Sequence, residues 1–252
     1  MASDPTRQLA FDLRLRPSRG RGDFYVAPAN ALAVATLDQA QGWPGGRMLL
    51  IGPEGAGKSH LAAIWAEENG AEVVRASLGA EAGQGGAGAL CEQSAPALSR
   101  SAAVVVEDAE AVAGDPAQEA ALFHLYNLMA AEGGRLLLTA RTPPRDWGLT
   151  LPDLISRMSA MASVRIEPPD DALLSAVLVK LFADRQLAVP PALIPWLVTH
   201  MDRSLATARR LVAALDARAL AERRAITRPL AAQVLDSLSA PPQDDADAAP
   251  RP

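Results

Sequence analysis

The chain has 252 residues and a formal net charge of −5, which suits one large domain or two small ones. This charge argues against a protein that coats nucleic acid by bulk charge, although it leaves a local basic face open. Cys91 is the single cysteine, so no disulfide can form within the chain, and nothing around it indicates a nucleophile. We expect a globular protein of a reducing cytoplasm.

The first patterned segment is TRQLAFDL at residues 6–13, in which Leu9, Phe11 and Leu13 alternate as in an extended strand. Residues 14–23 follow with several charges, one Pro and two Gly, the composition of a flexible linker. An extended peptide on a linker can insert apolar side chains into a groove of another protein, while the amide of Gln8 sets its register. The alternative is an edge strand packed on the chain's own domain.

From residue 24 onward, short apolar runs alternate with longer amphipathic segments. Strands are expected at residues 47–52, 71–76, 102–108, 135–140 and 162–168, and helices at 31–40, 60–68, 117–131 and 151–158. Asn30 is expected to cap the first helix, and residues 79–88, with five glycines, to form a loop. This alternation predicts an α/β domain, with helices on both faces of a parallel sheet.

After the Pro-Pro pair at residues 168–169, the chain has only helical periodicity, at residues 171–186, 191–201, 204–224 and 228–238. The organisation expected is a flexible tail (1–22), an α/β domain (23–168), a small helical domain (169–239) and a disordered acidic tail (240–252). No apolar run is long enough for a membrane span and no signal peptide begins the chain, which favours a soluble cytoplasmic protein.

The segment GPEGAGKS at residues 52–59 fills every fixed position of the phosphate-binding P-loop, between an expected strand and an expected helix. Its glycines let backbone N–H groups surround phosphates at a helix N-terminus. Lys58 is expected to reach the β- and γ-phosphates, and Ser59 to ligate Mg²⁺. The other expected nucleotide contacts are Pro53, Glu54, Gly55, Ala56, Gly57 and His60.

Two acidic residues, Glu107 and Asp108, directly follow the apolar run at residues 102–106. A P-loop enzyme needs a carboxylate at the end of a neighbouring strand to hold its metal. We therefore expect Glu107 to serve the metal and Asp108 to polarise an attacking water. The alternative is that both carboxylates simply leave the sheet into solvent.

These motifs resemble those of a known family. A P-loop domain followed by a small helical domain is the plan of AAA+ ATPases, and the segments GPEGAGKSHL, EDAEAVAGD, LFHLYNLM, LLLTARTPP and LPDLISRM are similar to the Hda family of DnaA-related proteins. The resemblance extends over residues 5–238. It implies an AAA+ sheet with a helical lid, bound ADP or ATP with Mg²⁺, and Val26 beside the adenine. It also implies that Gln8, Leu9, Phe11 and Leu13 bind the sliding clamp, the β subunit of DNA polymerase.

The resemblance further places Arg157 where the family has an arginine finger, which acts on the γ-phosphate of a neighbouring subunit. Four positions outside the N-terminal peptide depart from the family. Arg141 stands at sensor 1, where a small polar or acidic residue is usual. Ala206 stands at the sensor 2 arginine, with Arg209 one turn later as a substitute. Glu107 replaces the usual Asp and Asp108 replaces a longer acid, so intrinsic hydrolysis is expected to be slow.

The function implied is a negative regulator of replication initiation that promotes hydrolysis of ATP on DnaA while tethered to the clamp. An ATPase in its own right, such as a helicase loader or a DnaA-like initiation factor, is the alternative, and a small-molecule kinase fits less well. Self-association is left open, and no membrane partner is expected. Contact with DNA is expected to be indirect or weak, although Arg203, Arg209, Arg210, Arg218, Arg223 and Arg224 make the third helix of the lid basic.

Overall fold

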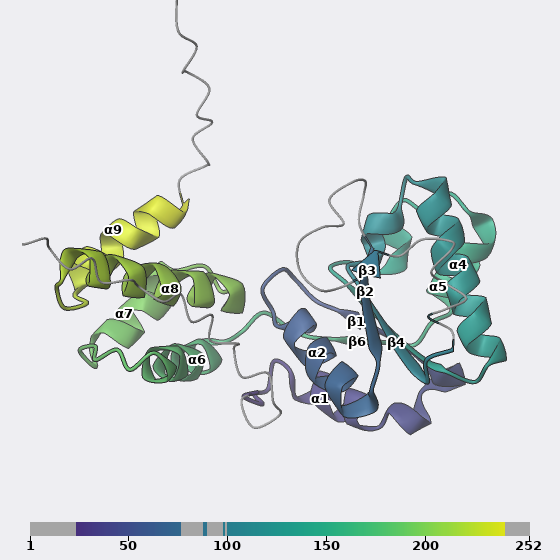
Figure 1. Ribbon diagram of the computed structural model, residues 1–252, viewed down its shortest axis with the longest axis horizontal. Helices are drawn as coiled ribbons and strands as arrows, with labels where there is room; N and C mark the ends of the chain where they lie inside the picture. The colour runs from purple at the N-terminus through teal and green to yellow at the C-terminus, as the bar shows by residue number, and fades with distance from the viewer. Residues whose placement is uncertain (1–23, 77–87, 90–97, 99, 240–252) are drawn as a thin grey trace, which may run out of the picture.

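The computed structural model describes residues 24–76, 88–89, 98 and 100–239. Figure 1 shows a twisted sheet with helices on both faces and, beside it, a separate group of helices formed by the C-terminal part of the chain. None of the helices in these residues is long and apolar enough to cross a membrane.

The sheet has six strands in the order β3-β2-β4-β5-β1-β6, and every neighbouring pair is parallel. The strands are β1 (Arg47–Ile51), β2 (Glu72–Arg75), β3 (Gly88–Ala89), β4 (Ala103–Glu107), β5 (Arg135–Ala140) and β6 (Ser163–Arg165). The predicted α/β architecture is thereby confirmed. Gly88, expected in a loop, instead pairs with Val74, and most of that glycine-rich segment lies outside the described residues.

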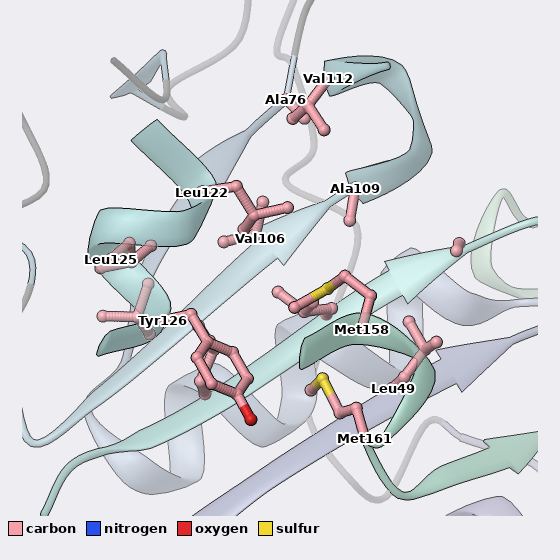
Figure 2. Packing of buried hydrophobic residues seen from close by; sticks show 14 of the residues in the cluster. Leu49, Ala76, Val106, Ala109, Val112, Leu122, Leu125, Tyr126, Met158 and Met161 are labelled. Carbon is pink, nitrogen blue, oxygen red and sulfur yellow. The ribbon is translucent and has the colours of Figure 1, made fainter. Parts of the chain in front are cut away.

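The central strands are apolar on both faces because helices cover both. Alternate residues such as Leu49, Val106 and Leu138 pack with α4 (Pro116–Ala131) and α5 (Pro152–Ser159), as Figure 2 shows for part of this cluster. Their neighbours Leu50 and Val105 pack with α1 (Ala31–Asp38) and α2 (Lys58–Asn69) on the opposite face. Short 3₁₀ helices connect these elements at η2 (Ala40–Gly42), η3 (Pro44–Gly46), η4 (Ala109–Val112) and η5 (Pro144–Asp146).

The helical domain consists of α6 (Asp171–Asp184), α7 (Leu193–His200), α8 (Leu205–Glu222) and α9 (Arg228–Ser239), which share one apolar core. Side-chain oxygens fix two of the helix starts. Asp170 accepts from the backbone N–H of Leu173 at 2.7 Å, and Ser204 accepts from that of Thr207 at 3.1 Å. Ala27 from the N-terminal segment also belongs to this core, so the segment before α1 touches both domains.

The expectation that the Asn30 side chain caps α1 is wrong. Its amide points backward instead: Oδ1 accepts from the Ala27 N–H at 2.9 Å and Nδ2 donates to the Tyr25 carbonyl at 3.0 Å. Asn30 is buried, and these two bonds satisfy its amide while folding residues 25–30 into a tight turn. A residue that looks like a helix cap therefore holds the segment expected to flank the adenine.

Candidate nucleotide site

The P-loop connects β1 to α2 and forms a cradle of backbone groups. Gly55 and Gly57 have φ angles of 74° and 105°, a region that side-chain-bearing residues rarely adopt. Gly57 directly precedes α2, which begins at Lys58. The N–H groups of the loop and of the first turn of α2 can therefore point toward an anion.

Lys58 is almost fully buried at the base of this cradle. Its ammonium donates to the carbonyls of Gly52 at 2.7 Å and Pro53 at 3.0 Å. Burial lowers the pKa of Lys58 below the usual 10.5; the carboxylates of Glu110, Asp108 and Glu54 act in the opposite direction, and Arg141 adds to the lowering. A buried cation held by carbonyls suits an incoming phosphate.

The two acids predicted beyond β4 have different environments. Glu107 is buried and forms an ion pair with Arg75 at 3.1 Å, so the carboxylate expected to serve the metal already has a cation. Asp108 lies in the left-handed region at φ 53°, and its N–H donates to the Thr139 hydroxyl on β5 at 3.1 Å. Only Asp108 of the pair contributes to the pKa of Lys58. Arg75 Nε also lies 3.7 Å from Asp108 Oδ2. The structure therefore ties both acids to Arg75 on β2 and brings Asp108 alone of the two close to the P-loop lysine.

Glu110 is a third acid at this site, which the sequence reasoning did not assign. Its Oε1 accepts from the Arg141 N–H at 2.9 Å, while Oε2 is buried without a hydrogen-bond partner among the described residues. It also has the largest influence among the carboxylates on the pKa of Lys58. The signal was present in the segment EDAE, where a third carboxylate follows two residues after Asp108.

The helical domain reaches the P-loop through the start of α8. The Leu205 N–H donates to the Gly55 carbonyl at 2.8 Å, and Arg209 Nη2 lies 2.8 Å from Nδ1 of His60 on α2. Arg209 thus contacts the P-loop helix, and its expected contact with the nucleotide stays a prediction. Ala206, at the expected sensor 2 position, is partly buried. Ser59 is exposed on the first turn of α2, and Val26 keeps 54% of its surface exposed in the segment before α1.

Arg157 lies apart from this group. It is exposed on α5, and its guanidinium carbon is 6.0 Å from the centre of the Tyr126 ring on α4. Glu119, another residue that the sequence reasoning missed, fixes the approach to α5. Its buried carboxylate accepts from the N–H groups of Leu151 at 2.7 Å and Thr150 at 2.9 Å. In the sequence, Glu119 could have been recognised as the single acidic residue on an otherwise apolar helix face.

The peptide predicted to bind the sliding clamp, with Gln8, Leu9, Phe11 and Leu13, lies outside the described residues, so its role stays a prediction. Cys91 also lies outside them.

Comparison with known proteins shows what the helical domain and the whole fold are similar to. Residues 171–235 match the family model described as Hda, lid domain. Domain III of the replication initiation protein DnaA from Thermotoga maritima has the same fold, with a TM-score of 0.71 at 16% identity over 89% of this chain and 98% of that one. The chain therefore has the AAA+ fold, and its helical domain is similar to the Hda lid.

Two further structures have the same fold with an adenine nucleotide bound. AMPPCP-bound DnaA from Aquifex aeolicus gives a TM-score of 0.60 at 17% identity over 79% of this chain and 65% of that one. The FIGL-1 AAA domain in complex with ADP gives a TM-score of 0.60 at 17% identity over 86% of this chain and 81% of that one. At such identities, the likeness establishes the AAA+ fold.

Proposed function

We propose that this protein is a nucleotide-controlled negative regulator of replication initiation, which binds the sliding clamp through residues 8–13 and presents Arg157 to ATP held by DnaA. The observation that carries the proposal is the position of Arg157. Its side chain is exposed on α5, on the face of the sheet covered by α4, where its ring contact is Tyr126 rather than the protein's own P-loop. An arginine so placed is available to a second molecule.

In this proposal the protein's own nucleotide, ADP or ATP, is mainly a structural ligand. Lys58 and the backbone of residues 55–57 would hold its phosphates, and Ser59 would hold Mg²⁺. No cluster of three His, Cys, Asp or Glu side chains suited to a metal occurs among residues 24–76 and 100–239, so phosphate oxygens would complete the ion's ligands. Mg²⁺ would supply charge neutralisation between the phosphates and nearby carboxylates. Arg209 and His60 then couple the bound nucleotide to the lid.

A self-sufficient ATPase, such as a helicase loader or a DnaA-like initiation factor, is the second candidate. Asp108 beside Lys58 favours it, because a carboxylate at that point can orient a water molecule. The ion pair of Glu107 with Arg75 argues for slow turnover, since the carboxylate expected at the metal has another partner. Turnover by the isolated protein separates the two candidates.

The deciding experiment measures hydrolysis of ATP prebound to DnaA, in the presence of clamp loaded on DNA. The wild-type protein should stimulate hydrolysis, and Arg157→Ala should remove the stimulation while keeping ADP and clamp binding. Arginine fingers are worth roughly 10³–10⁵ in rate. Arg145→Ala is the matched control, because its side chain is 81% exposed and pairs only loosely with Asp146 at 3.7 Å.

A second arm tests the tether. Gln8→Ala, or removal of residues 1–14, should abolish capture by the purified clamp and hence the stimulation, with nucleotide affinity unchanged. Normal stimulation by Arg157→Ala would assign the finger elsewhere. Clamp binding by the truncated chain would eliminate the tether.

A further inference from the structure

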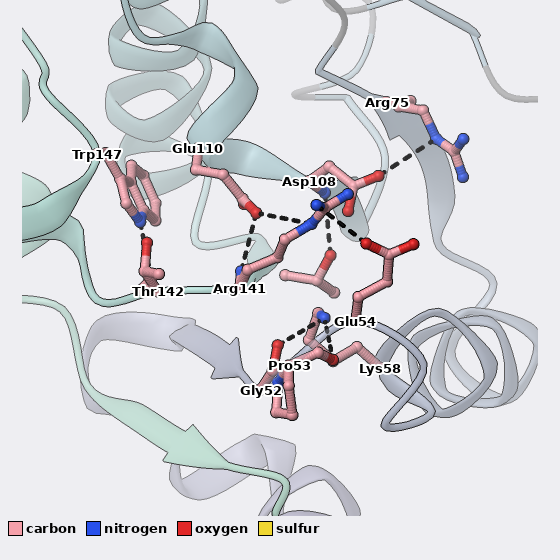
Figure 3. A network of polar contacts seen from close by, with 11 residues as sticks. Gly52, Pro53, Glu54, Lys58, Arg75, Asp108, Glu110, Arg141, Thr142 and Trp147 are labelled. Atoms are coloured by element: carbon pink, nitrogen blue, oxygen red, sulfur yellow. Dashed lines mark hydrogen bonds and ion pairs between the residues drawn. The ribbon is translucent and has the colours of Figure 1, made fainter. Parts of the chain in front are cut away.

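An ion-pair bridge lies across the phosphate end of the P-loop. Arg141 Nη1 is 3.1 Å from Glu54 Oε2, and Arg141 Nε is 3.8 Å from Glu110 Oε1. Figure 3 shows the guanidinium between the two carboxylates, with the Lys58 ammonium beneath the Glu54 end. Arg141 directly follows β5, Glu54 belongs to the P-loop and Glu110 to η4, so one side chain connects three segments around the site.

The two ends of this bridge are held unequally. Glu110 has a side chain only 19% exposed and also accepts the backbone N–H of Arg141 at 2.9 Å, which fixes it relative to the residue it pairs with. Glu54 is 76% exposed and stands on the loop itself. Exposed ion pairs are weak because water and salt screen them. The Glu54 end therefore opens more readily than the Glu110 end.

The bridge is close enough to act on the phosphate-binding lysine. Both Glu54 and Arg141 shift the pKa of Lys58, in opposite directions, together with Glu110 and Asp108. A polyphosphate chain bound at Lys58 therefore extends into the field of the Glu54–Arg141 pair. Each further phosphate adds negative charge next to the Glu54 carboxylate and offers Arg141 a competing partner.

We propose that the Glu54–Arg141 ion pair is a latch that sets the preference of this site for nucleoside diphosphate over triphosphate. A diphosphate ends at Lys58 and leaves the pair intact. A third phosphate must separate Arg141 from Glu54 and lie beside the released carboxylate. This inference rests on the nucleotide site proposed above and assigns its selectivity to two residues of the chain.

The test compares dissociation constants for ADP and ATP, both with Mg²⁺, by titration calorimetry on the full chain. Glu54→Gln should improve ATP binding relative to ADP by about three- to tenfold, since it removes the repelling charge and releases Arg141. Arg141→Gln should weaken ATP relative to ADP by a similar factor, because Glu54 then faces the third phosphate without its counter-ion. In the double variant, the gain from Glu54→Gln should shrink, since no cation is released.

Arg145→Gln is the control, because it removes an exposed arginine four residues along the same segment whose partner is Asp146. It should leave both constants unchanged. The latch would be overturned, and the nucleotide site left in place, if Glu54→Gln and Arg141→Gln both kept the ratio of the ATP and ADP dissociation constants within twofold of wild type. If the wild-type chain bound neither nucleotide, the proposed site and the latch would both fail.

Discussion

Lys58 carries a charge in a site that water barely reaches, and this burial determines its pKa and its response to a bound phosphate. The free energy of burying the ammonium is offset by two carbonyl hydrogen bonds and by the fields of Glu110, Asp108 and Glu54. The balance still leaves the pKa of Lys58 lowered. A phosphate group would add opposite charge at close range, favour the protonated form and raise this pKa.

This linkage predicts a pH dependence of nucleotide binding. Because phosphate prefers the charged lysine, ADP affinity should be fully present below the lowered pKa of Lys58 and should fall as pH rises through it, before 10.5 is reached. Calorimetry in alkaline buffers of different ionisation enthalpy should detect proton uptake on binding. Lys58→Ala should abolish both binding and uptake, whereas Lys180→Ala, at the only other lysine in the sequence, should change neither. ADP affinity that stayed flat up to pH 10.5 would contradict this account.

For single residues, the sequence predicts a role where the residue belongs to a contiguous motif. Lys58 and Ser59 follow from spacing alone, because a P-loop is contiguous. The ion pair of Arg75 with Glu107 does not, since it joins residues on adjacent strands far apart in sequence. The backward-facing amide of Asn30 is missed for another reason: a cap and a turn-holding amide have the same sequence signature.

Among the elements, α5 is a short helix that carries Arg157 and is held in place by its contacts with the sheet and with α4. It has eight residues, too few for a stable isolated helix. Leu154 and Met158 bury one of its sides against the sheet, while the Glu119 carboxylate holds the two residues before it. Burial raises the pKa of Glu119, but the N–H groups of Leu151, Thr150 and Gly114 outweigh this effect and leave the pKa lowered.

Glu119→Gln should therefore loosen the start of α5. The glutamine is of similar size but carries an NH₂ that cannot accept from the N–H groups, so the expected loss is about 1.5–3 kcal/mol of unfolding free energy, measured by urea denaturation. Because the pKa is lowered from 4.5, the stabilisation is present above that pH and lost as pH falls through the lower value. The variant's stability deficit should accordingly shrink in acid.

The same variant should also reduce the Arg157-dependent stimulation of DnaA with ADP affinity unchanged. Glu132→Gln, at the exposed C-terminal end of α4, is the control and should be neutral in both assays. Equal stability of Glu119→Gln and wild type at neutral pH would show that the hydrogen bonds of the Glu119 carboxylate do not hold the start of α5. Sequence periodicity predicts α4 and α5 as helices, but the carboxylate that connects them is visible only once both are folded.

In the whole molecule, the lid and the sheet domain meet at the P-loop itself. The start of α8 donates to the Gly55 carbonyl, Arg209 contacts His60, and the N-terminal segment places Ala27 in the lid core. The Glu167 N–H also donates to the Ala29 carbonyl at 2.9 Å, which ties the end of the sheet domain to the same segment. These contacts connect the P-loop directly to the lid. The periodicity of the sequence predicts a sheet domain followed by a helical one. It does not predict that the lid docks on the P-loop, because a P-loop glycine in the sequence indicates only a contact with phosphate.

Gly55→Ala should undock the lid. A Cβ at Gly55 would come 1.9 Å from the Ser204 Oγ, too close for any packing, whereas a Cβ at Gly70 would meet nothing within 4 Å. Both glycines have left-handed φ angles, 74° and 61°, so Gly70→Ala reproduces the backbone strain without the clash. Small-angle X-ray scattering should show a larger maximum dimension for Gly55→Ala than for Gly70→Ala. Adding Ser204→Gly to Gly55→Ala removes the opposing Oγ and should restore part of the compact form. Identical scattering from the two alanine variants would mean that the lid is held by contacts other than Ser204 and Leu205 against the P-loop.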